Sequence, residues 1–217
     1  MTVSIDSVPL ERFTPHILPL AEACPEFLMR RSLVATICDI CRKTGCLTST
    51  TEFNVKAGVA EYDIVPVDDS LTVEQVRQLY LDGAALKPMS HDQIFAAYHG
   101  VDPALKVGKP LFYTFQSKSR VILTPTPDAD GHARIVFFAS VPMRSPQVPR
   151  VFLDDWLDVV VDGTLSRLLR VAGQTFSNAR MAEECRIRYE IGLNSIHREA
   201  AQDFTRAAGR VNFNQVL

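Results

Sequence analysis

The sequence lacks the signatures of several large protein classes. It contains no apolar run of the ~18 residues that a membrane-spanning helix requires, so no membrane span is expected. Its first residues show neither a basic segment nor an unbroken apolar core, so no secretory signal is expected. A glycine-rich phosphate loop and a Gly-x-Ser-x-Gly elbow are also missing, so no motif indicates a nucleotide site or a hydrolase nucleophile.

The chain also lacks an excess of either charge. Its 23 Lys and Arg residues nearly balance 25 Asp and Glu residues, for a formal net charge of −2. Binding of nucleic acid through its phosphates needs a concentrated basic face, so this composition disfavours a DNA-binding module. All the lysines lie between Lys43 and Lys118, and after that point the basic residues other than His are Arg. Arginine suits structured ion pairs at interfaces, although a bias in composition explains the pattern equally well.

Cysteine is scarce and odd in number. Five cysteines in 217 residues fit a reducing compartment better than a disulfide framework. Cys38 and Cys41 fall on one face of a predicted helix, near its C-terminal end. A zinc site needs four ligands, and no second pair follows at a useful spacing. We therefore expect both side chains to be buried as small hydrophobic residues, with no metal and no cofactor.

No constellation of polar residues indicates catalysis. The five histidines are scattered along the chain. Asp155, Asp158 and Asp162 share a helical face, but acids near the start of a helix are typical of a polar surface that the helix dipole favours. Asp128-Ala-Asp130-Gly131 resembles the start of a calcium loop without its remaining ligands and is interpreted as a hairpin turn. No catalytic residue is assigned, and the protein is not expected to be an enzyme.

The hydrophobic period changes along the chain. Residues 1–25 contain four prolines and only short apolar runs, which predict an extended N-terminal arm with at most one helical turn. Residues 26–45 predict a helix that starts after Pro25 and ends at Gly45 in a left-handed cap. Residues 46–149 show the period of two and the turn residues of a β-rich subdomain.

Several strands and one short helix are predicted within this β-rich segment. Asp82-Gly83 is a hairpin-turn signal, and Ser90 with Gln93 forms the capping box of a short helix. The predicted strands are Thr48–Val55, Glu61–Val65, Val73–Leu81, Ala85–Met89, Leu111–Gln116, Arg120–Leu123 and Ala133–Val141. We expect the first two strands to pair as a hairpin.

Two amphipathic helices are predicted after the β-rich segment. Residues 150–172 have a wide apolar face, and residues 177–208 form a helix of roughly 45 Å, capped by Ser177 or Asn178. The last helix carries one apolar stripe, namely Ala182, Cys185, Tyr189, Leu193, Ile196, Ala200, Phe204 and Ala207. Residues 209–217 are interpreted as a C-terminal arm.

These periods together predict an α+β fold. A helical bundle domain would comprise residues 26–45 and 150–208, and an antiparallel β subdomain, residues 46–149, would be inserted in it.

Eight short phrases in this chain are familiar in their order and spacing. They are Cys41-Arg-Lys-Thr-Gly45, Gly58-Val-Ala-Glu-Tyr62-Asp-Ile, Leu79-Tyr-Leu-Asp-Gly83, Gly108-Lys-Pro110 before Phe112-Tyr113, Leu123-Thr-Pro-Thr-Pro127, Phe152-Leu-Asp-Asp-Trp156, Asp162-Gly-Thr-Leu-Ser-Arg-Leu-Leu169 and Ser177-Asn-Ala. Together they resemble the head-to-tail adaptor (connector) proteins of tailed bacteriophages, especially the short-tailed type with a β insertion between helices. The resemblance covers about residues 20 to 208, and none of the phrases is a catalytic signature.

The resemblance implies a structural virion protein at the head–tail interface, assembled in the cytoplasm of the host bacterium. It implies a homo-oligomeric ring, a dodecamer, that docks on the phage portal protein and extends the DNA exit channel. The tail nozzle or other tail proteins would attach to the ring. Genomic DNA would pass through without sequence-specific binding, and a slightly acidic chain suits a channel that must not grip phosphate.

Two other function classes remain open from the residues. A small soluble enzyme of unrecognised class would use Cys, His and Asp side chains, such as Cys46 with the acids between Asp154 and Asp162. It requires a compact polar pocket with shifted titratable groups. A small DNA-binding module would instead bind DNA in a salt-dependent way.

A closed ring requires two different contact patches on each subunit. One patch is assigned to the acidic face of the first C-terminal helix, and the other to the basic flank of the last helix. The assigned residues are Asp155, Asp158 and Asp162 on the first helix, and Arg186, Arg198 and Arg206 on the last. The C-terminal arm is interpreted as a portal-docking segment anchored by Phe213, with Val211, Val216 and Leu217 as further contacts. A frayed terminus is the alternative.

Overall fold

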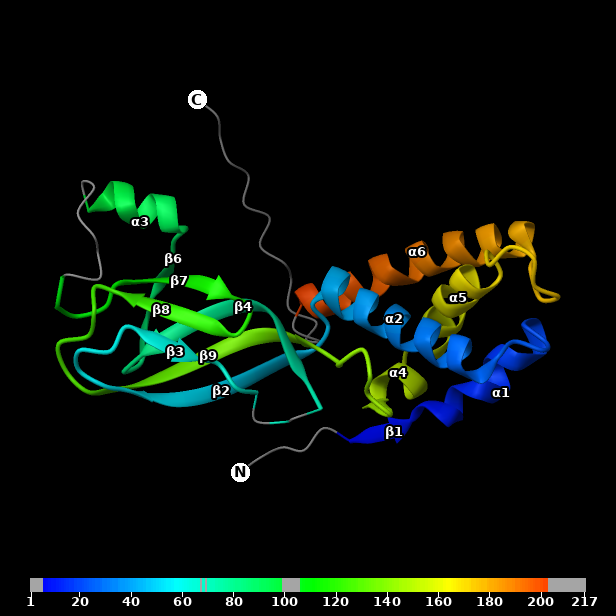
Figure 1. Cartoon of the computed structure of the whole chain (residues 1–217), viewed down its shortest axis with the longest axis horizontal. Helices are drawn as coiled ribbons and strands as arrows, with labels where there is room; N and C mark the ends of the chain where they lie inside the picture. Colours follow the sequence, from blue (N-terminus) through cyan, green and yellow to red (C-terminus); the bar gives the residue numbers. More distant parts are fainter. Residues whose placement is uncertain (1–5, 67, 69, 99–105, 203–217) are drawn as a thin grey trace. The chain divides into compact units, whose positions relative to one another are not determined.

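The computed structural model describes residues 6–66, 68, 70–98 and 106–202. Within these residues the chain forms two compact units (Figure 1). The helical unit combines Asp6–Cys46 with residues 143–202, and the β unit is the uninterrupted stretch Leu47–Pro142. The predicted α+β class, with a β subdomain inserted between helical segments, is confirmed.

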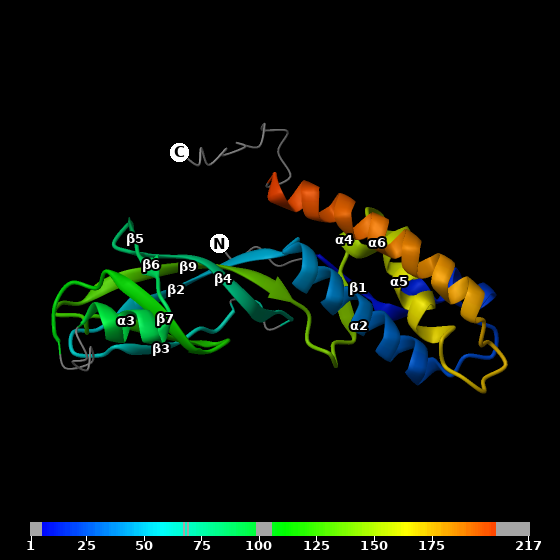
Figure 2. The same ribbon diagram turned by 90° about the horizontal axis from the view of Figure 1, so that it is seen from above.

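The helical unit is built around three helices that pack on one another (Figures 1 and 2). They are α2 (Glu26–Thr44), α5 (Leu157–Leu168) and α6 (Ala179–Ala201). The smaller elements of this unit are β1 (Ser7–Pro9), η1 (Leu10–Phe13), α1 (Thr14–Ile17), η2 (Leu18–Leu20), β10 (Gln147–Pro149) and α4 (Val151–Asp154). β1 and β10 pair as a short antiparallel ladder.

Helix α2 begins and ends as the sequence predicts. Pro25 is its N-cap, where the missing N–H costs nothing, and Glu26 lies in the first turn, where the helix dipole favours a negative charge. Gly45 adopts a φ of 63°, and its N–H donates to the Cys41 carbonyl at 2.9 Å. A left-handed residue at this position satisfies a carbonyl that would otherwise lack a partner.

Two glycines allow the three helices to approach closely. A Cβ on Gly163 of α5 would lie 2.5 Å from the Thr36 Cγ2 atom of α2 and 2.7 Å from the Tyr189 ring of α6. A Cβ on Gly192 of α6 would lie 2.5 Å from the Val159 Cγ2 atom of α5. All three distances are shorter than van der Waals contact, so the helices meet at a spacing that only glycine permits.

The prediction that residues 1–25 form an extended N-terminal arm is wrong for the described residues 6–25. Residues 6–25 form a strand and three consecutive short helical turns. Leu10, Phe13, Ile17 and Ala21 are spaced by three or four residues and are all buried. The prolines do not prevent these turns, because Pro15 and Pro19 occupy the first positions, where no N–H is needed.

The prediction of one continuous helix over residues 150–172 is also wrong. The chain leaves helical geometry at Trp156, which has φ −122° and ψ 24°, and so separates α4 from α5. The rings of Phe152 and Trp156 pack edge to face at 5.5 Å, and both are buried. Such an aromatic pair contributes about 0.5–1.5 kcal/mol beyond its burial, which helps to offset the interrupted helix.

Helix α6 starts as expected. The Asn178 side chain accepts a hydrogen bond from the Met181 N–H at 3.0 Å, so Asn178 is the N-cap. Along the predicted stripe, Ala182, Cys185, Tyr189, Leu193 and Ile196 are buried, as the spacing requires. The rest of the predicted helix beyond residue 202, including Phe204 and Ala207, lies outside the described residues, as does the predicted arm.

Two four-stranded sheets form the β unit. The first has the order β2 (Thr48–Val55), β9 (Gly131–Ser140), β4 (Thr72–Leu81), β5 (Ala84–Ala85). The second has the order β3 (Glu61–Asp63), β8 (Arg120–Thr124), β7 (Phe112–Ser117), β6 (Lys87–Pro88). All pairs are antiparallel except β6 with β7.

The predicted hairpin between the first two strands does not form. β2 pairs along its whole length with β9, and β3 pairs with β8 in the other sheet. The reason is the length and burial of β9, whose Ala133, Ile135, Phe137 and Ala139 are fully buried. A long buried strand can accept neighbours on both edges, and it offers β2 more hydrogen bonds than the three-residue β3 can.

The turn and capping residues predicted within the β unit are confirmed, whereas the predicted pairing of its first two strands is not. Asp82 and Gly83 have φ values of 49° and 80°, as a tight hairpin requires. Ser90 and Gln93 form the complete capping box of α3 (His91–Ala97). The strand predicted at Ala85–Met89 is instead divided, because its first part pairs with β4 and its later part pairs with β7.

The contact at Gly192 leads to a test of the helical packing. We expect Gly192→Ala to lower the free energy of unfolding by about 1–3 kcal/mol, because the new methyl group overpacks the contact with Val159. Val159→Ala in the same chain should recover much of this loss, since it removes the atoms that the methyl group meets. Chemical denaturation followed by the fluorescence of Trp156, the single tryptophan, measures the coupling between the two changes. Strictly additive losses would contradict the predicted contact.

Candidate functional site

A polar network joins the three main helices of the helical unit. Asp39 of α2 accepts hydrogen bonds from the Tyr189 hydroxyl of α6 at 2.9 Å and from the Arg167 guanidinium of α5 at 3.1 Å. Lys43 Nζ lies 2.9 Å from the same carboxylate oxygen. Burial, and then the charge of Asp39, raise the pKa of Tyr189 far above its ordinary value. The network satisfies polar groups between packed helices, and its role is structural.

A second ion pair joins α5 to α6 and includes one residue assigned to the acidic patch. Arg188 donates to Asp162 through Nε at 3.0 Å and through a terminal nitrogen at 2.7 Å. The Asp162 side chain is only 16% exposed. Its carboxylate is therefore committed within the subunit. Burial, with the nearby Asp162, also raises the pKa of the Cys185 thiol, which lies 3.2 Å from Arg188.

Arg186 is likewise occupied within its own helix. Its guanidinium lies between Glu183 and Glu190, one turn away on either side. Glu183 also accepts from Arg170 of the preceding segment at 3.0 Å. The hydrogen bond from Arg186 is the main cause that lowers the pKa of Glu183. Arg186 thus has little capacity left for a neighbouring chain.

The remaining assigned residues are more available. Asp155 and Asp158 are exposed and form no ion pair with any other described residue. The break at Trp156 places them on two different elements, Asp155 at the end of α4 and Asp158 in the first turn of α5. Arg198 is exposed, and its Nε contacts only the Asn194 carbonyl, at 3.3 Å, among the described residues. Arg206, Val211, Phe213, Val216 and Leu217 lie outside the described residues.

The outward face of α6 was not predicted. Ile187 is 48% exposed and Ile191 is 65% exposed, one turn apart and off the buried stripe. Two isoleucines at positions i and i+4 of an otherwise polar surface are a signal that the sequence contains. It is visible only after the buried stripe has been assigned, because either face of a helix can hold an apolar residue.

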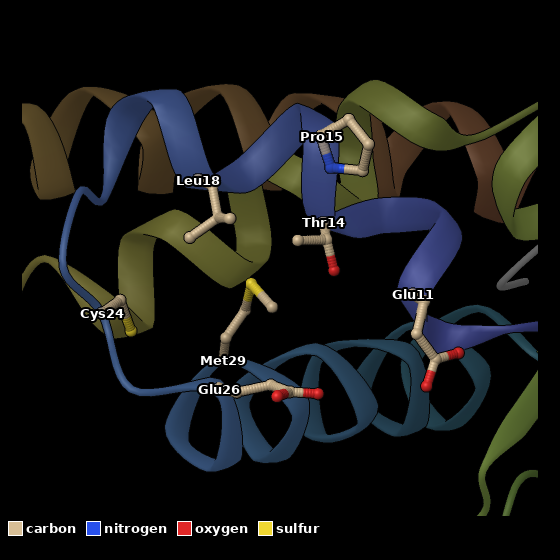
Figure 3. A pocket seen from close by; sticks show the side chains of 7 residues that line it. All are labelled: Glu11, Thr14, Pro15, Leu18, Cys24, Glu26 and Met29. Atoms are coloured by element: carbon tan, nitrogen blue, oxygen red, sulfur yellow. The ribbon is translucent and has the colours of Figure 1, made fainter.

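A groove also lies between the N-terminal segment and the start of α2. It has a volume of about 520 Å³ and is lined by Glu11, Thr14, Pro15, Leu18, Cys24, Glu26 and Met29. Figure 3 shows Leu18 and Met29 pointing into the groove from its two walls. Arg30 pairs with both carboxylates that line it, Glu11 and Glu26. Phe27, which follows Glu26 in the chain, is 73% exposed. The helical unit therefore has exposed apolar side chains at the start of α2 as well as on the outward face of α6.

The chemistry-bearing residues do not assemble into a reactive centre within the described part of the chain. No group of three or more His, Cys, Asp or Glu residues is placed there to hold a metal ion. All five cysteines are described and buried, and none forms a disulfide. No described helix is long and apolar enough to cross a membrane.

Comparison with known protein families identifies the class of protein. Residues 20–212 match the family model described as SU10 adaptor protein, which covers most of the 217 residues. The chain belongs to the SU10 adaptor protein family. No curated protein matches it. Membership confirms the predicted resemblance to phage head-to-tail adaptors and makes the chain a structural virion component.

The adaptor family implies interaction with the portal and tail proteins of a phage. It also counts against the alternative of a small enzyme, because adaptors are structural proteins. The exposed faces of this adaptor are therefore more informative about its function than any single polar pocket.

The buried phenol of Tyr189 leads to a prediction about alkaline pH. Its pKa is raised above 10.0 in the folded state, so its contribution to stability is fully present below about pH 10 and is lost as the pH rises further. When the pH is raised from about 8 to about 11, the free energy of unfolding should fall less in Tyr189→Phe than in the wild type, because phenylalanine has no phenol to deprotonate. At pH 8 the variant should be less stable by about 1 kcal/mol, because the hydrogen bond to Asp39 is missing.

Denaturation curves at both pH values, recorded by Trp156 fluorescence, measure this difference. Tyr80→Phe is the matched control, since Tyr80 lies in the β unit. Equal losses for Tyr189→Phe and the wild type would contradict the predicted role of the phenol.

Proposed function

We propose that this adaptor forms a closed homo-oligomeric ring, a dodecamer, that docks on the portal protein of a short-tailed phage. The ring extends the DNA exit channel and attaches the tail nozzle or other tail proteins. The family match over residues 20–212 is the observation that carries this proposal. The slightly acidic chain supports it further, since a channel that lets DNA pass must not hold its phosphates.

The contact between neighbouring subunits is proposed to join two different faces of the helical unit. The first is the outward face of α6, where Ile187 and Ile191 supply an apolar centre and Arg198 a positive charge. The second is the acidic turn formed by Asp155 and Asp158, which have no internal ion pair among the described residues. Opposite charges on two distinct faces suit a head-to-tail contact that closes by rotation.

This assignment narrows the set of residues derived from the sequence. Asp162 lies on α5 and Arg186 on α6, but each already forms an ion pair inside the subunit. They are therefore not proposed as charged contacts with a neighbouring subunit. Reversing Asp162 would leave Arg188 beside a positive charge and would disturb the fold as well as the contact. Asp158 and Arg198 are the better probes, because both are exposed.

A charge exchange tests this contact. We expect Asp158→Lys and Arg198→Glu each to reduce incorporation of the adaptor on portal-bearing heads, because each places like charges opposite one another. A chain that carries both changes should recover much of the incorporation, since the pair is restored with its signs exchanged. Sedimentation of heads with purified adaptor measures the bound amount.

Asp128→Lys is the matched control, because it makes the same change of charge on an exposed residue of the β unit. Each variant is first compared with the wild type by circular dichroism and thermal melting. Full incorporation of both folded single variants would exclude the proposed contact.

The C-terminal residues 209–217 are proposed to form the arm that docks on the portal. Its apolar residues Val211, Phe213, Val216 and Leu217 alternate with polar ones over part of the arm. This pattern suits an extended segment added to the portal.

Removal of residues 210–217 should separate docking from folding. We expect the truncated chain to keep the melting temperature of the wild type but to lose stable binding to purified portal rings. Phe213→Ala should weaken binding, whereas the neighbouring Asn214→Ala should have little effect. If particles assemble at normal levels with the truncated adaptor, residues 210–217 are not needed for docking on the portal.

A further inference from the structure

The segment Ala84–Pro88 lies at the edge of both sheets in the β unit. Its first residues form β5, the last strand of one sheet, and Lys87 and Pro88 form β6, the last strand of the other. The backbone hydrogen bonds that hold it include those from Leu86 N to the Leu79 carbonyl at 2.9 Å and from Lys87 N to the Leu111 carbonyl at 3.1 Å. Because Pro88 has no backbone N–H, this edge presents its side chains to a partner and disfavours the addition of another strand.

A groove follows this edge. It has a volume of about 310 Å³ and is lined by residues 84–87 and 109–112. Lys87 and Lys109 are its charged residues, both are exposed, and neither pairs with a carboxylate in the described part of the chain. Leu111, in the same lining segment as Lys109, is 57% exposed. We name this surface the basic groove.

A third lysine lies near the same segment. Lys106 is exposed and sits over the Tyr98 ring at 4.8 Å, three residues before Lys109. The neighbouring Val107 is 67% exposed. The surface therefore combines positive charge with apolar side chains, and none of the described residues that line the groove is acidic. Within a chain of slightly negative net charge, such a combination indicates a specific partner.

We propose that the basic groove binds an extended acidic segment of a tail protein, with an apolar side chain of that segment seated against Leu111. This inference rests on the proposed function, which assigns the helical unit and the C-terminal arm to the ring and the portal. The β unit then remains for the tail. Carboxylates of the segment would pair with Lys87 and Lys109.

The composition of the groove favours a protein over DNA. Binding of single-stranded nucleic acid uses exposed aromatic side chains on which bases stack, but Phe112, the aromatic residue among the described lining residues, is only partly exposed, whereas the aliphatic Leu111 is 57% exposed. Phosphate binding to a duplex uses many cations along a face, whereas the described lining of this groove has two. An acidic peptide with an apolar anchor fits both its charge and its apolar wall.

Charge reversal in the groove provides the test. Tailless heads that lack the adaptor are mixed with purified adaptor, and the amount of bound adaptor is measured before purified tails are added. We expect Lys87→Glu/Lys109→Glu to bind heads like the wild type but to slow tail attachment at least about tenfold, because like charges then face each other. Tail attachment by the wild type should weaken as salt rises.

Two further variants sharpen the comparison. Lys109→Glu alone should give a partial loss, and Lys56→Glu, the same change at an exposed lysine outside the groove lining, should give none. Phage that carry the double variant should regain titre through substitutions that remove an acidic residue from one tail protein. Such suppressors would identify the segment that binds the groove.

The outcomes distinguish the two proposals. If wild-type adaptor does not bind the heads, the proposed function itself fails. If the double variant binds heads and attaches tails at the normal rate, the basic groove is not the tail site. If tail attachment is normal but heads lose their DNA, the groove contacts DNA and the inference is overturned.

Discussion

The close approach of α2, α5 and α6 around Gly163 is the constraint on which the helical unit depends. With no Cβ at that position, Thr36 and the Tyr189 ring pack against the α5 backbone. This spacing brings the Tyr189 hydroxyl to Asp39, which Arg167 and Lys43 also reach. Because Tyr189 faces inward, the rotation of α6 is fixed, and Ile187 and Ile191 must face outward. The same packing therefore determines both the core and the exposed face that is proposed to meet a neighbour.

The ion pairs of α5 and α6 limit what the surface can offer to other subunits. Arg188 with Asp162, and Arg186 with two glutamates, satisfy most of the charge inside one chain. Exposed ion pairs contribute only about 0–1 kcal/mol each, so a ring contact cannot depend on charge alone. In the proposed ring, Ile187 and Ile191 would provide the burial, and Asp158 with Arg198 would set the orientation.

The sequence predicted elements wherever a local rule decides the structure. Gly45, Asp82-Gly83, the Ser90 capping box and the buried stripe of α6 each follow from the geometry of a few neighbouring residues. The predictions were wrong where a residue or strand far away in the sequence determines the structure. β2 pairs with β9 because β9 is long and one of its faces is fully buried, and no pattern within residues 48–65 contains that information. The break at Trp156 and the buried turns around Phe13 likewise depend on tertiary packing, which overrides local preference. For the candidate site, spacing placed Asp155, Asp158 and Arg198 on the surface. It could not show that Asp162 and Arg186 already have partners.

Repetition changes how much binding each surface must supply. A groove of about 310 Å³ with two lysines is a weak site by itself. In the proposed ring every subunit presents the same groove, so the second and later contacts with a tail become intramolecular. Their effective concentration is set by the ring, and the total affinity rises steeply without any new contact. Weak single sites have an advantage in such an assembly, because an isolated subunit does not capture the tail protein before the ring exists. The sparse charge and small apolar area of each surface therefore suit a protein that must bind its partners only after it has assembled.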